Sequence, residues 1–103
     1  MVDVKKMVEN AEKVEEIAGR TVVLTKKEVY ILQNEEDKKF SKTNEHGQLV
    51  YGAKRMMEER EERCREVTGT EEFKNFKGDL KLKVSQFQDD EEFSRFLEVY
   101  EVI

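Results

Sequence analysis

Hydrophobic residues at the start of the chain recur at the spacing of a helix. At about 100° per residue they share one stripe of a helical surface. An aspartate at position 3 is a suitable N-cap, and a glycine at position 19 is a suitable end. The pattern therefore predicts one helix over residues 4–18, with an apolar stripe formed by Val4, Met7, Val8, Ala11, Val14 and Ala18.

The next segments are rich in β-branched and aromatic residues, which are typical of strands. TVVLT at 21–25 and EVYILQ at 28–33 are separated by two lysines, and this pattern predicts a hairpin. Further on, KKFSKT at 38–43 and QLVY at 48–51 flank an Asn-Glu-His-Gly sequence. Asn and Gly favour tight turns, so we expect a second hairpin there.

Helical signals return after Gly52. A helix is predicted from Ala53 to Val67, with Gly69 at its end. Thr70 can cap a short helical turn that carries two phenylalanines. Leucine and valine then alternate with lysine over 80–84, which predicts a strand with one exposed face. We expect a last helix from 89 onward, although its final five residues, VYEVI, fit a strand equally well.

This order of elements predicts an α+β fold. Hairpins favour a mainly antiparallel sheet of three to five strands, with helices packed on one face. The strands of that sheet are expected from 21–25, 28–33 and 80–84. A length of 103 residues suits a single domain over 1–103.

The charged sequence MMEEREERCREV lies within the predicted helix 53–67. Glu59–Arg63 and Glu61–Arg65 have the favourable i,i+4 order, so we interpret most of this surface as a solvated, self-paired face. Arg60 instead shares a stripe with Met56 and Cys64. We expect its side chain to extend along the core edge to water. The alternative is that this end of the helix, including Met57, binds a partner.

Catalytic, metal and cofactor motifs are missing from the sequence. The chain has one cysteine, Cys64, and one histidine, His46, too few for a structural zinc site. A catalytic dyad would require these two residues to meet. The acids at 89–92 fit the first turn of a helix better than a calcium loop. Phosphate-binding glycine motifs and a nucleophile elbow are absent, so we expect no enzymatic activity, no cofactor and no metal.

The hydropathy pattern also bears on location. No apolar run approaches the roughly 18 residues that a membrane span needs. The first ten residues are amphipathic and lack the apolar core of a signal peptide. A lone cysteine is compatible with a reducing compartment. We therefore expect a cytoplasmic protein without a membrane partner.

Charge points to a protein partner. The net charge is −5, and residues 70–103 carry five basic against nine acidic residues. A dense acidic face can imitate nucleic-acid phosphate and occupy the basic surface of a partner protein, as small viral inhibitors of host defence do. We therefore predict a non-enzymatic binding module or inhibitor with these partner-binding residues: Arg60, Glu71, Glu72, Asp89, Asp90, Glu91 and Glu92.

A second hypothesis is that the sheet binds single-stranded nucleic acid. Tyr30, Phe40 and Tyr51 would stack on bases. The nearby lysines would contact phosphate: Lys26, Lys27, Lys38, Lys39 and Lys42. Ordinary core packing explains the aromatic residues more simply, and the net charge has the opposite sign to that of a generic nucleic-acid binder. We rank this hypothesis below the protein-binding one.

Overall fold

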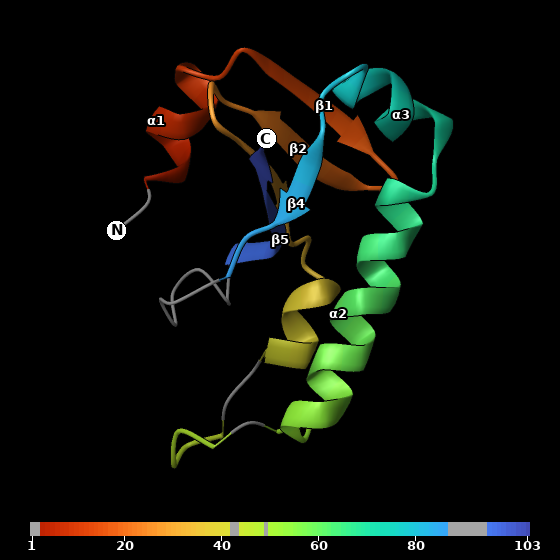
Figure 1. Ribbon diagram of the computed structural model, residues 1–103. Helices are drawn as coiled ribbons and strands as arrows, with labels where there is room; N and C mark the ends of the chain where they lie inside the picture. The colour runs from red at the N-terminus through yellow and green to blue at the C-terminus, as the bar shows by residue number, and fades with distance from the viewer. Residues whose placement is uncertain (1–2, 42–43, 49, 87–94) are drawn as a thin grey trace.

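A computed structural model describes residues 3–41, 44–48, 50–86 and 95–103. Its centre is a five-stranded antiparallel sheet with strand order β1-β2-β3-β5-β4 (Figure 1). The strands are β1 (Lys13–Ile17), β2 (Arg20–Leu24), β3 (Glu28–Leu32), β4 (Leu82–Val84) and β5 (Phe96–Val102). The helices are α1 (Val4–Glu9), the 3-10 helix η1 (Asp37–Ser41), α2 (Ala53–Thr68) and α3 (Glu71–Lys77).

The α+β class and the antiparallel sheet are confirmed. Strand alternation places two apolar clusters on opposite faces of the sheet. Val22, Val29 and Ile31 join Val67 of α2 and the phenylalanines of α3 on the first face. Val23 and Tyr30 join Phe96 and Val99 on the second face, where residues of α1 also pack. The strands β2 and β3 are therefore buried on both faces, which explains their nearly continuous apolar sequences.

The single helix predicted over 4–18 is wrong. α1 ends at Glu9, and residues 13–17 form β1, which pairs with β2 along its whole length. The two strands are joined by Ala18 and Gly19, whose φ angles are 51° and 79°. Two successive residues with positive φ form the type I′ hairpin turn, whose twist matches that of paired strands. Pairing with β2 therefore overrides the helical spacing of the apolar residues.

The predicted second hairpin is also wrong. Residues 37–41 form η1, and within the described residues of 38–51 there is no strand. Asn34 and Asp37 exchange hydrogen bonds between side chain and backbone, which fixes the start of η1. The Asn44–Gly47 segment does form a turn, closed by a hydrogen bond from the Gly47 N–H to the Asn44 carbonyl.

The last element is β5 and not a helix over its described length. Phe96–Val102 runs between β3 and β4, with a register shift next to Leu32. Of the two alternatives for the final residues, the strand is correct up to Val102. The predicted helix start at 89–92 lies outside the described residues.

The helices in the second half follow the sequence closely. α2 begins at Ala53, and the backbone N–H of Gly69 closes its last turn. The hydroxyl of Thr70 accepts a hydrogen bond from the Phe73 N–H and caps α3 as expected. The second half of α2 lies beside the sheet. Its first half extends beyond the sheet, together with η1 (Figure 1).

Candidate functional site

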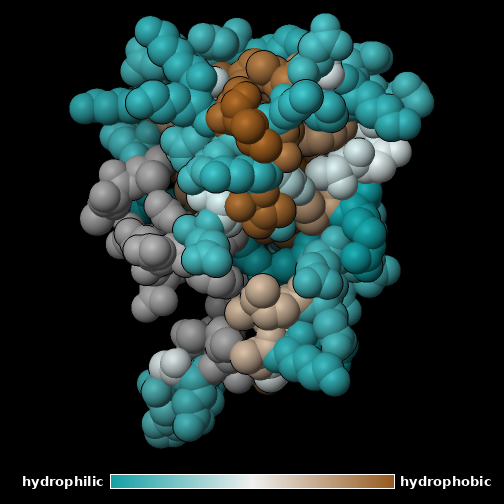
Figure 2. Space-filling view, viewed as in Figure 1, coloured by the Kyte–Doolittle hydropathy of each residue, from teal (hydrophilic) through white to brown (hydrophobic). Residues whose placement is uncertain are grey.

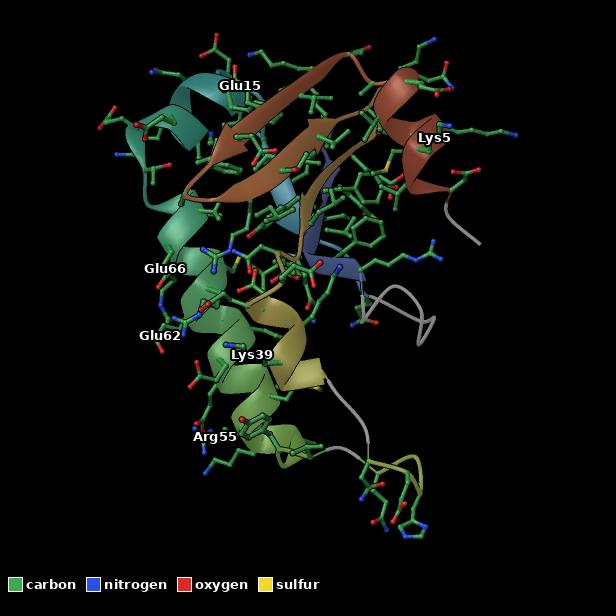
Figure 3. All side chains as sticks on the ribbon, turned by 180° about the vertical axis from the view of Figure 1, so that it is seen from behind. Lys5, Glu15, Lys39, Arg55, Glu62 and Glu66 are labelled. Carbon is green, nitrogen blue, oxygen red and sulfur yellow. The ribbon has the colours of Figure 1, made fainter. Side chains whose placement is uncertain are left out.

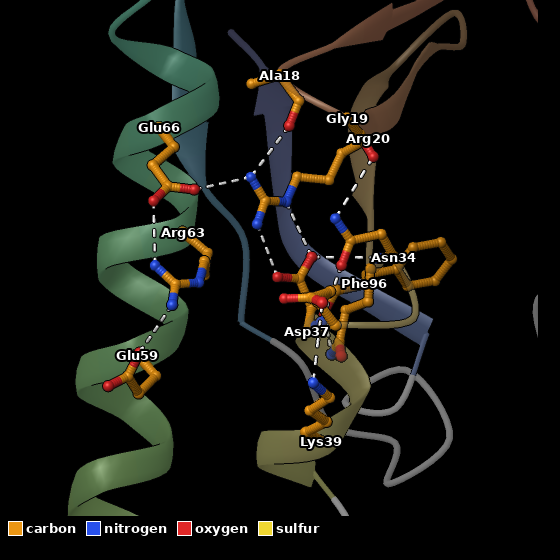
Figure 4. Close-up of polar contacts among 12 residues, drawn as sticks. Ala18, Gly19, Arg20, Asn34, Asp37, Lys39, Glu59, Arg63, Glu66 and Phe96 are labelled. Atoms are coloured by element: carbon orange, nitrogen blue, oxygen red, sulfur yellow. Dashed lines mark hydrogen bonds and ion pairs between the residues drawn. The ribbon is translucent and has the colours of Figure 1, made fainter.

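A buried ionic network joins β2, η1 and α2 (Figure 4). The Arg20 guanidinium donates two hydrogen bonds to the Asp37 carboxylate, at 2.9 and 2.8 Å. It donates a third to Glu66 of α2 at 2.9 Å, and Glu66 also accepts from Arg63. Arg20 and Asp37 are both buried. The sequence does not reveal this network, because its members are 17 and 46 residues apart and share no local pattern.

The network fixes the charges of its two buried members. Hydrogen bonding to Asp37 raises the pKa of Arg20, although burial opposes the rise. Burial pushes the pKa of Asp37 upward, but hydrogen bonds from Arg20 and the Asn34 backbone outweigh it and hold that pKa below its usual value. Both groups are therefore charged at neutral pH. Their contacts lie between structural elements, so we assign the network to the scaffold.

Arg60 is buried at 6% exposure, so the expectation that it extends to water is wrong. Its guanidinium donates hydrogen bonds to the backbone carbonyls of Phe96 and Leu97. These carbonyls lie at the irregular start of β5, where the pairing with β3 shifts register. Burial lowers the pKa of Arg60, while Glu98 opposes that effect. The side chain of this predicted partner-binding residue thus faces the interior of the protein.

Cys64 lies beside Tyr100 and not beside a histidine. The Sγ atom is 2.9 Å from the Tyr100 hydroxyl, and burial raises the pKa of both groups. His46 lies in the exposed turn, with its Nε2 3.5 Å from a carboxylate oxygen of Glu45. A protonated, buried thiol is a poor nucleophile. Among the described residues no group of three or more candidate ligands could hold a metal ion.

The exposed side of α2 carries charge that is only partly self-paired (Figure 3). Arg63 contacts Glu59 at 3.4 Å, as predicted. The predicted Glu61–Arg65 pair is not among the ion pairs of the described residues. Met57 is 45% exposed, whereas Met56 is buried against the fold. Acidic and basic residues are mixed along this face, so it does not present one sign of charge.

The acidic excess of the last third depends on a few residues. Without residues 87–94, which include Asp89, Asp90, Glu91 and Glu92, the segment 70–103 has five basic and five acidic residues. Those four predicted site residues lie outside the described residues. Glu71 and Glu72 are exposed in the first turn of α3, where the helix dipole favours acids.

α3, which carries Glu71 and Glu72, packs beside β1, which carries further acids. At this contact the Lys13 Nζ donates to the Phe76 carbonyl at 3.1 Å. Glu72 lies one turn before Phe76 on the same side of α3. Figure 3 shows Glu15 on the β1 side that borders α3. We call this surface the acidic edge, and it comprises Glu12, Glu15, Glu16, Glu71 and Glu72.

β1 is the outer strand on this side, and four of its five residues are exposed. An outer strand leaves backbone N–H and C=O groups that can pair with another chain. Among the described residues, the carboxylates of Glu12, Glu15 and Glu72 have no ion-pair or hydrogen-bond partner. The other two members of the edge are paired, because Glu16 accepts a hydrogen bond from the Thr21 hydroxyl and Glu71 pairs with Lys74 at 3.6 Å. The acidic edge therefore combines free carboxylates with free backbone groups. The sequence could have shown it only if the strand at 13–17 had been recognised.

The opposite outer strand has the opposite charge. β4 borders a groove of about 730 Å³ that runs along α3. Its apolar lining includes Phe73, Leu82, Val84 and Tyr100, and Figure 2 shows apolar side chains gathered over β4 and the C-terminus. Asp79 is the acidic residue of the lining. We call this surface the lysine edge, defined by Lys74, Lys77, Lys81 and Lys83.

Tyr30 and Tyr51, the two aromatic residues of the nucleic-acid hypothesis whose side chains the structure describes, do not form an exposed platform. Tyr30 is 9% exposed, and its ring centroid lies 5.0 Å from that of Phe96 in the core. Tyr51 is half-buried and stacks on the Arg55 guanidinium. The Phe40 side chain lies outside the described residues. Lys26 and Lys27 are exposed, but the hollow of about 540 Å³ beside them also contains Asp3 and Glu28.

Comparison with protein-family models, with curated proteins and with solved structures finds no match to this chain. No helix in the described part of the chain is long and apolar enough to cross a membrane. The two charged outer strands are therefore the features from which function can be argued.

Proposed function

We propose that the protein is a small non-enzymatic protein-binding module, acting in the cytoplasm, that presents its acidic edge to a basic surface of another protein. The carrying observation is an exposed outer strand that, together with α3 beside it, presents the carboxylates of Glu12, Glu15 and Glu72, which are unpaired within the described part of the chain. Carboxylates held for an internal role would be paired, as Asp37 and Glu66 are. Free carboxylates on one surface create a field that attracts a basic partner.

Strand pairing gives this proposal a specific contact. A basic extended segment of the partner can add to β1, with its backbone bonded to the free groups of the strand. Its cationic side chains then meet Glu15 and Glu16, while cationic groups further out reach Glu71 and Glu72 on α3. In this arrangement the module can occupy a groove that otherwise binds nucleic-acid phosphate, which makes it an inhibitor of that partner.

The test begins with partners captured from nuclease-treated lysate and continues with the purified pair. We expect Glu15→Lys combined with Glu72→Lys to weaken binding about tenfold or more, because two attractions become repulsions. Raising salt should slow association, since exposed charges are screened beyond about 10 Å at 0.1 M. Affinity and association rate are measured by surface plasmon resonance over a series of salt concentrations.

A matched control reverses two acids on the exposed side of α2, Glu58→Lys with Glu62→Lys. It has the same net charge as the test variant and should bind like the wild type. Reversal of Asp89, Asp90, Glu91 and Glu92 measures whether that segment adds to the contact. Equal affinities for the test variant and the wild type would show that the acidic edge is not the binding surface.

A further inference from the structure

The surfaces around the two outer strands of the sheet have opposite charges, and each outer strand also has an exposed valine. β1 borders the acidic edge and β4 borders the lysine edge, at opposite ends of one sheet. α3 contributes residues to both edges, and its Glu71 and Lys74 pair with each other at 3.6 Å. Val14 on β1 is 41% exposed and Val84 on β4 is 59% exposed, and each lies in an outer strand. A surface that complements another surface of the same molecule forms head-to-tail contacts between copies.

The hydrogen-bond pattern of the sheet shows which backbone N–H and C=O groups of the outer strands are free to pair with another strand. The Ile103 N–H bonds to the Lys81 carbonyl and the Ser85 N–H to the Val99 carbonyl, so 81, 83 and 85 face β5. Leu82 and Val84 then direct their backbone groups away from the sheet, because bonding alternates along an antiparallel strand. On β1, the two-residue turn makes Ile17 and Arg20 a bonded pair. The outward backbone groups of β1 are therefore those of Val14 and Glu16.

We infer that β4 of one copy pairs antiparallel with β1 of a second copy, with Val84 opposite Val14. This inference rests on the proposed function, because it names the basic partner of the same acidic edge. In this register Lys83, which pairs with Glu101 of its own chain at 3.2 Å, also lies opposite Glu15 of the second copy, and Leu82 lies opposite Glu16. Shifting β1 by two residues, so that Leu82 faces Val14, instead places Lys83 opposite Lys13. Opposite charges stabilise a cross-strand pair and like charges destabilise it, so the first register is preferred.

The groove beside β4 supports this register. Leu82 pairs with Val102, and Val84 with Tyr100, so both side chains lie on the face of the sheet that carries α3. Opposite residues of paired strands share a face, so the incoming Val14 and Glu16 reach the same side. Val14 covers the exposed Val84. The Glu16 carboxylate meets the rim of the groove, which is lined by Lys74 and Lys77.

Charge exchange tests the pairing. Lys83→Glu puts a carboxylate opposite Glu15 of the second copy, and Glu15→Lys puts an ammonium group opposite Lys83. Because Lys83→Glu also removes the ion pair with Glu101 of the same chain, thermal unfolding of this variant checks that β4 still forms. Each single variant should lower the self-association constant by about tenfold. Combining both substitutions in one chain leaves the net charge at its wild-type value and restores opposite charges, so self-association should return. Sedimentation equilibrium over a wide concentration range measures each association constant.

Two exposed substitutions on other elements are the controls, Lys39→Glu on η1 and Glu62→Lys on α2. They change net charge by the same amounts and should associate like the wild type. A cross-link gives a second measurement, because paired residues lie about 5.5 Å apart at Cα, within reach of a disulfide. Under oxidation, Val14→Cys mixed with Val84→Cys should form a covalent dimer, whereas Val14→Cys mixed with Val50→Cys should not.

A wild-type protein that stays monomeric at every concentration overturns the inference. So does a doubly substituted protein that fails to regain association, because the register requires Lys83 to face Glu15. Neither of these two results contradicts the proposed function, because that function is tested by binding to a different purified partner. Conversely, self-association that follows the charge-exchange pattern supports the inference even if Glu15→Lys with Glu72→Lys leaves binding to that other partner unchanged.

Discussion

Arg60 carries a charge into the interior of the fold, and backbone carbonyls receive its hydrogen bonds. A β-bulge leaves backbone groups outside the regular ladder, and buried carbonyls need donors. The register shift between β3 and β5 occurs where Phe96 and Leu97 begin β5. The guanidinium, with several donors, therefore completes the hydrogen bonding at the start of this strand.

We predict that Arg60→Met destabilises the protein by about 1–3 kcal/mol. Methionine fills similar space but leaves the Leu97 carbonyl without its arginine donor, and an unsatisfied buried group costs about that much. Urea unfolding of both proteins gives the difference in the free energy of unfolding. Arg65→Met, at an exposed position of the same helix, is the control and should change stability by less than about 0.5 kcal/mol. An unchanged midpoint for Arg60→Met would show that the carbonyls do not depend on this side chain.

The sequence shows which charged residues are unusual but not what they contact. Arg60 could be identified because it lies on an apolar stripe, but neither its burial nor its carbonyl partners could be read from that position. Arg20 and Asp37 carried no such signal, since Arg20 follows a turn glycine at the start of a strand and Asp37 lies among other polar residues. Their contact depends on how β2 and η1 meet, and this arrangement is decided by the packing of the whole sheet. Local sequence patterns therefore indicate which charged residues are unusual, whereas their hydrogen-bond and ion-pair partners are determined by the tertiary structure.

At the scale of elements, the β1–β2 turn is strained by its alanine. Ala18 has a φ of 51°, a conformation that glycine and asparagine adopt more readily than alanine. We predict that Ala18→Asn stabilises the protein by about 0.5–1 kcal/mol, because Asn-Gly is the preferred type I′ pair. Ala18→Val should destabilise it, since a β-branched residue resists positive φ. Thermal unfolding of the three proteins should rank them in that order. A stabilising Ala18→Val would contradict the assigned turn.

The elements that could be predicted have strong signals within their own residues. α2 and α3 have helical spacing and terminal glycines or a threonine cap, and β2 and β3 are rich in β-branched residues. β1 and β5 were missed or left ambiguous because their apolar residues also fit helical spacing. Pairing with neighbouring strands decides between the two structures, and a single segment of sequence does not contain that information. The acidic edge was missed for the same reason.

At the scale of the whole molecule, two carboxyl groups, those of the buried Asp37 and the half-buried Glu98, give opposite contributions to stability at acid pH. The folded pKa of Asp37 lies below its unfolded value, so its stabilisation is present above that value and is lost as pH falls through the folded pKa. Burial raises the folded pKa of Glu98 above its unfolded value, despite the attraction of Arg60. Ionisation of Glu98 therefore favours unfolding. The stability that the protonated carboxyl group contributes is fully present below the unfolded pKa and is lost as pH rises through the folded pKa.

We predict that Glu98→Gln increases the free energy of unfolding at neutral pH, because glutamine removes a charge that is costly to bury. The gain should shrink as pH falls and disappear below about 4.3, where the carboxyl group of the wild type is protonated in both states. Denaturant unfolding of the two proteins over this pH range measures the difference, in which the contribution of Asp37 cancels. Glu62→Gln on the exposed side of α2 is the control and should show little pH-dependent difference. A gain for Glu98→Gln that stays constant with pH would mean that packing, and not the buried charge, is responsible.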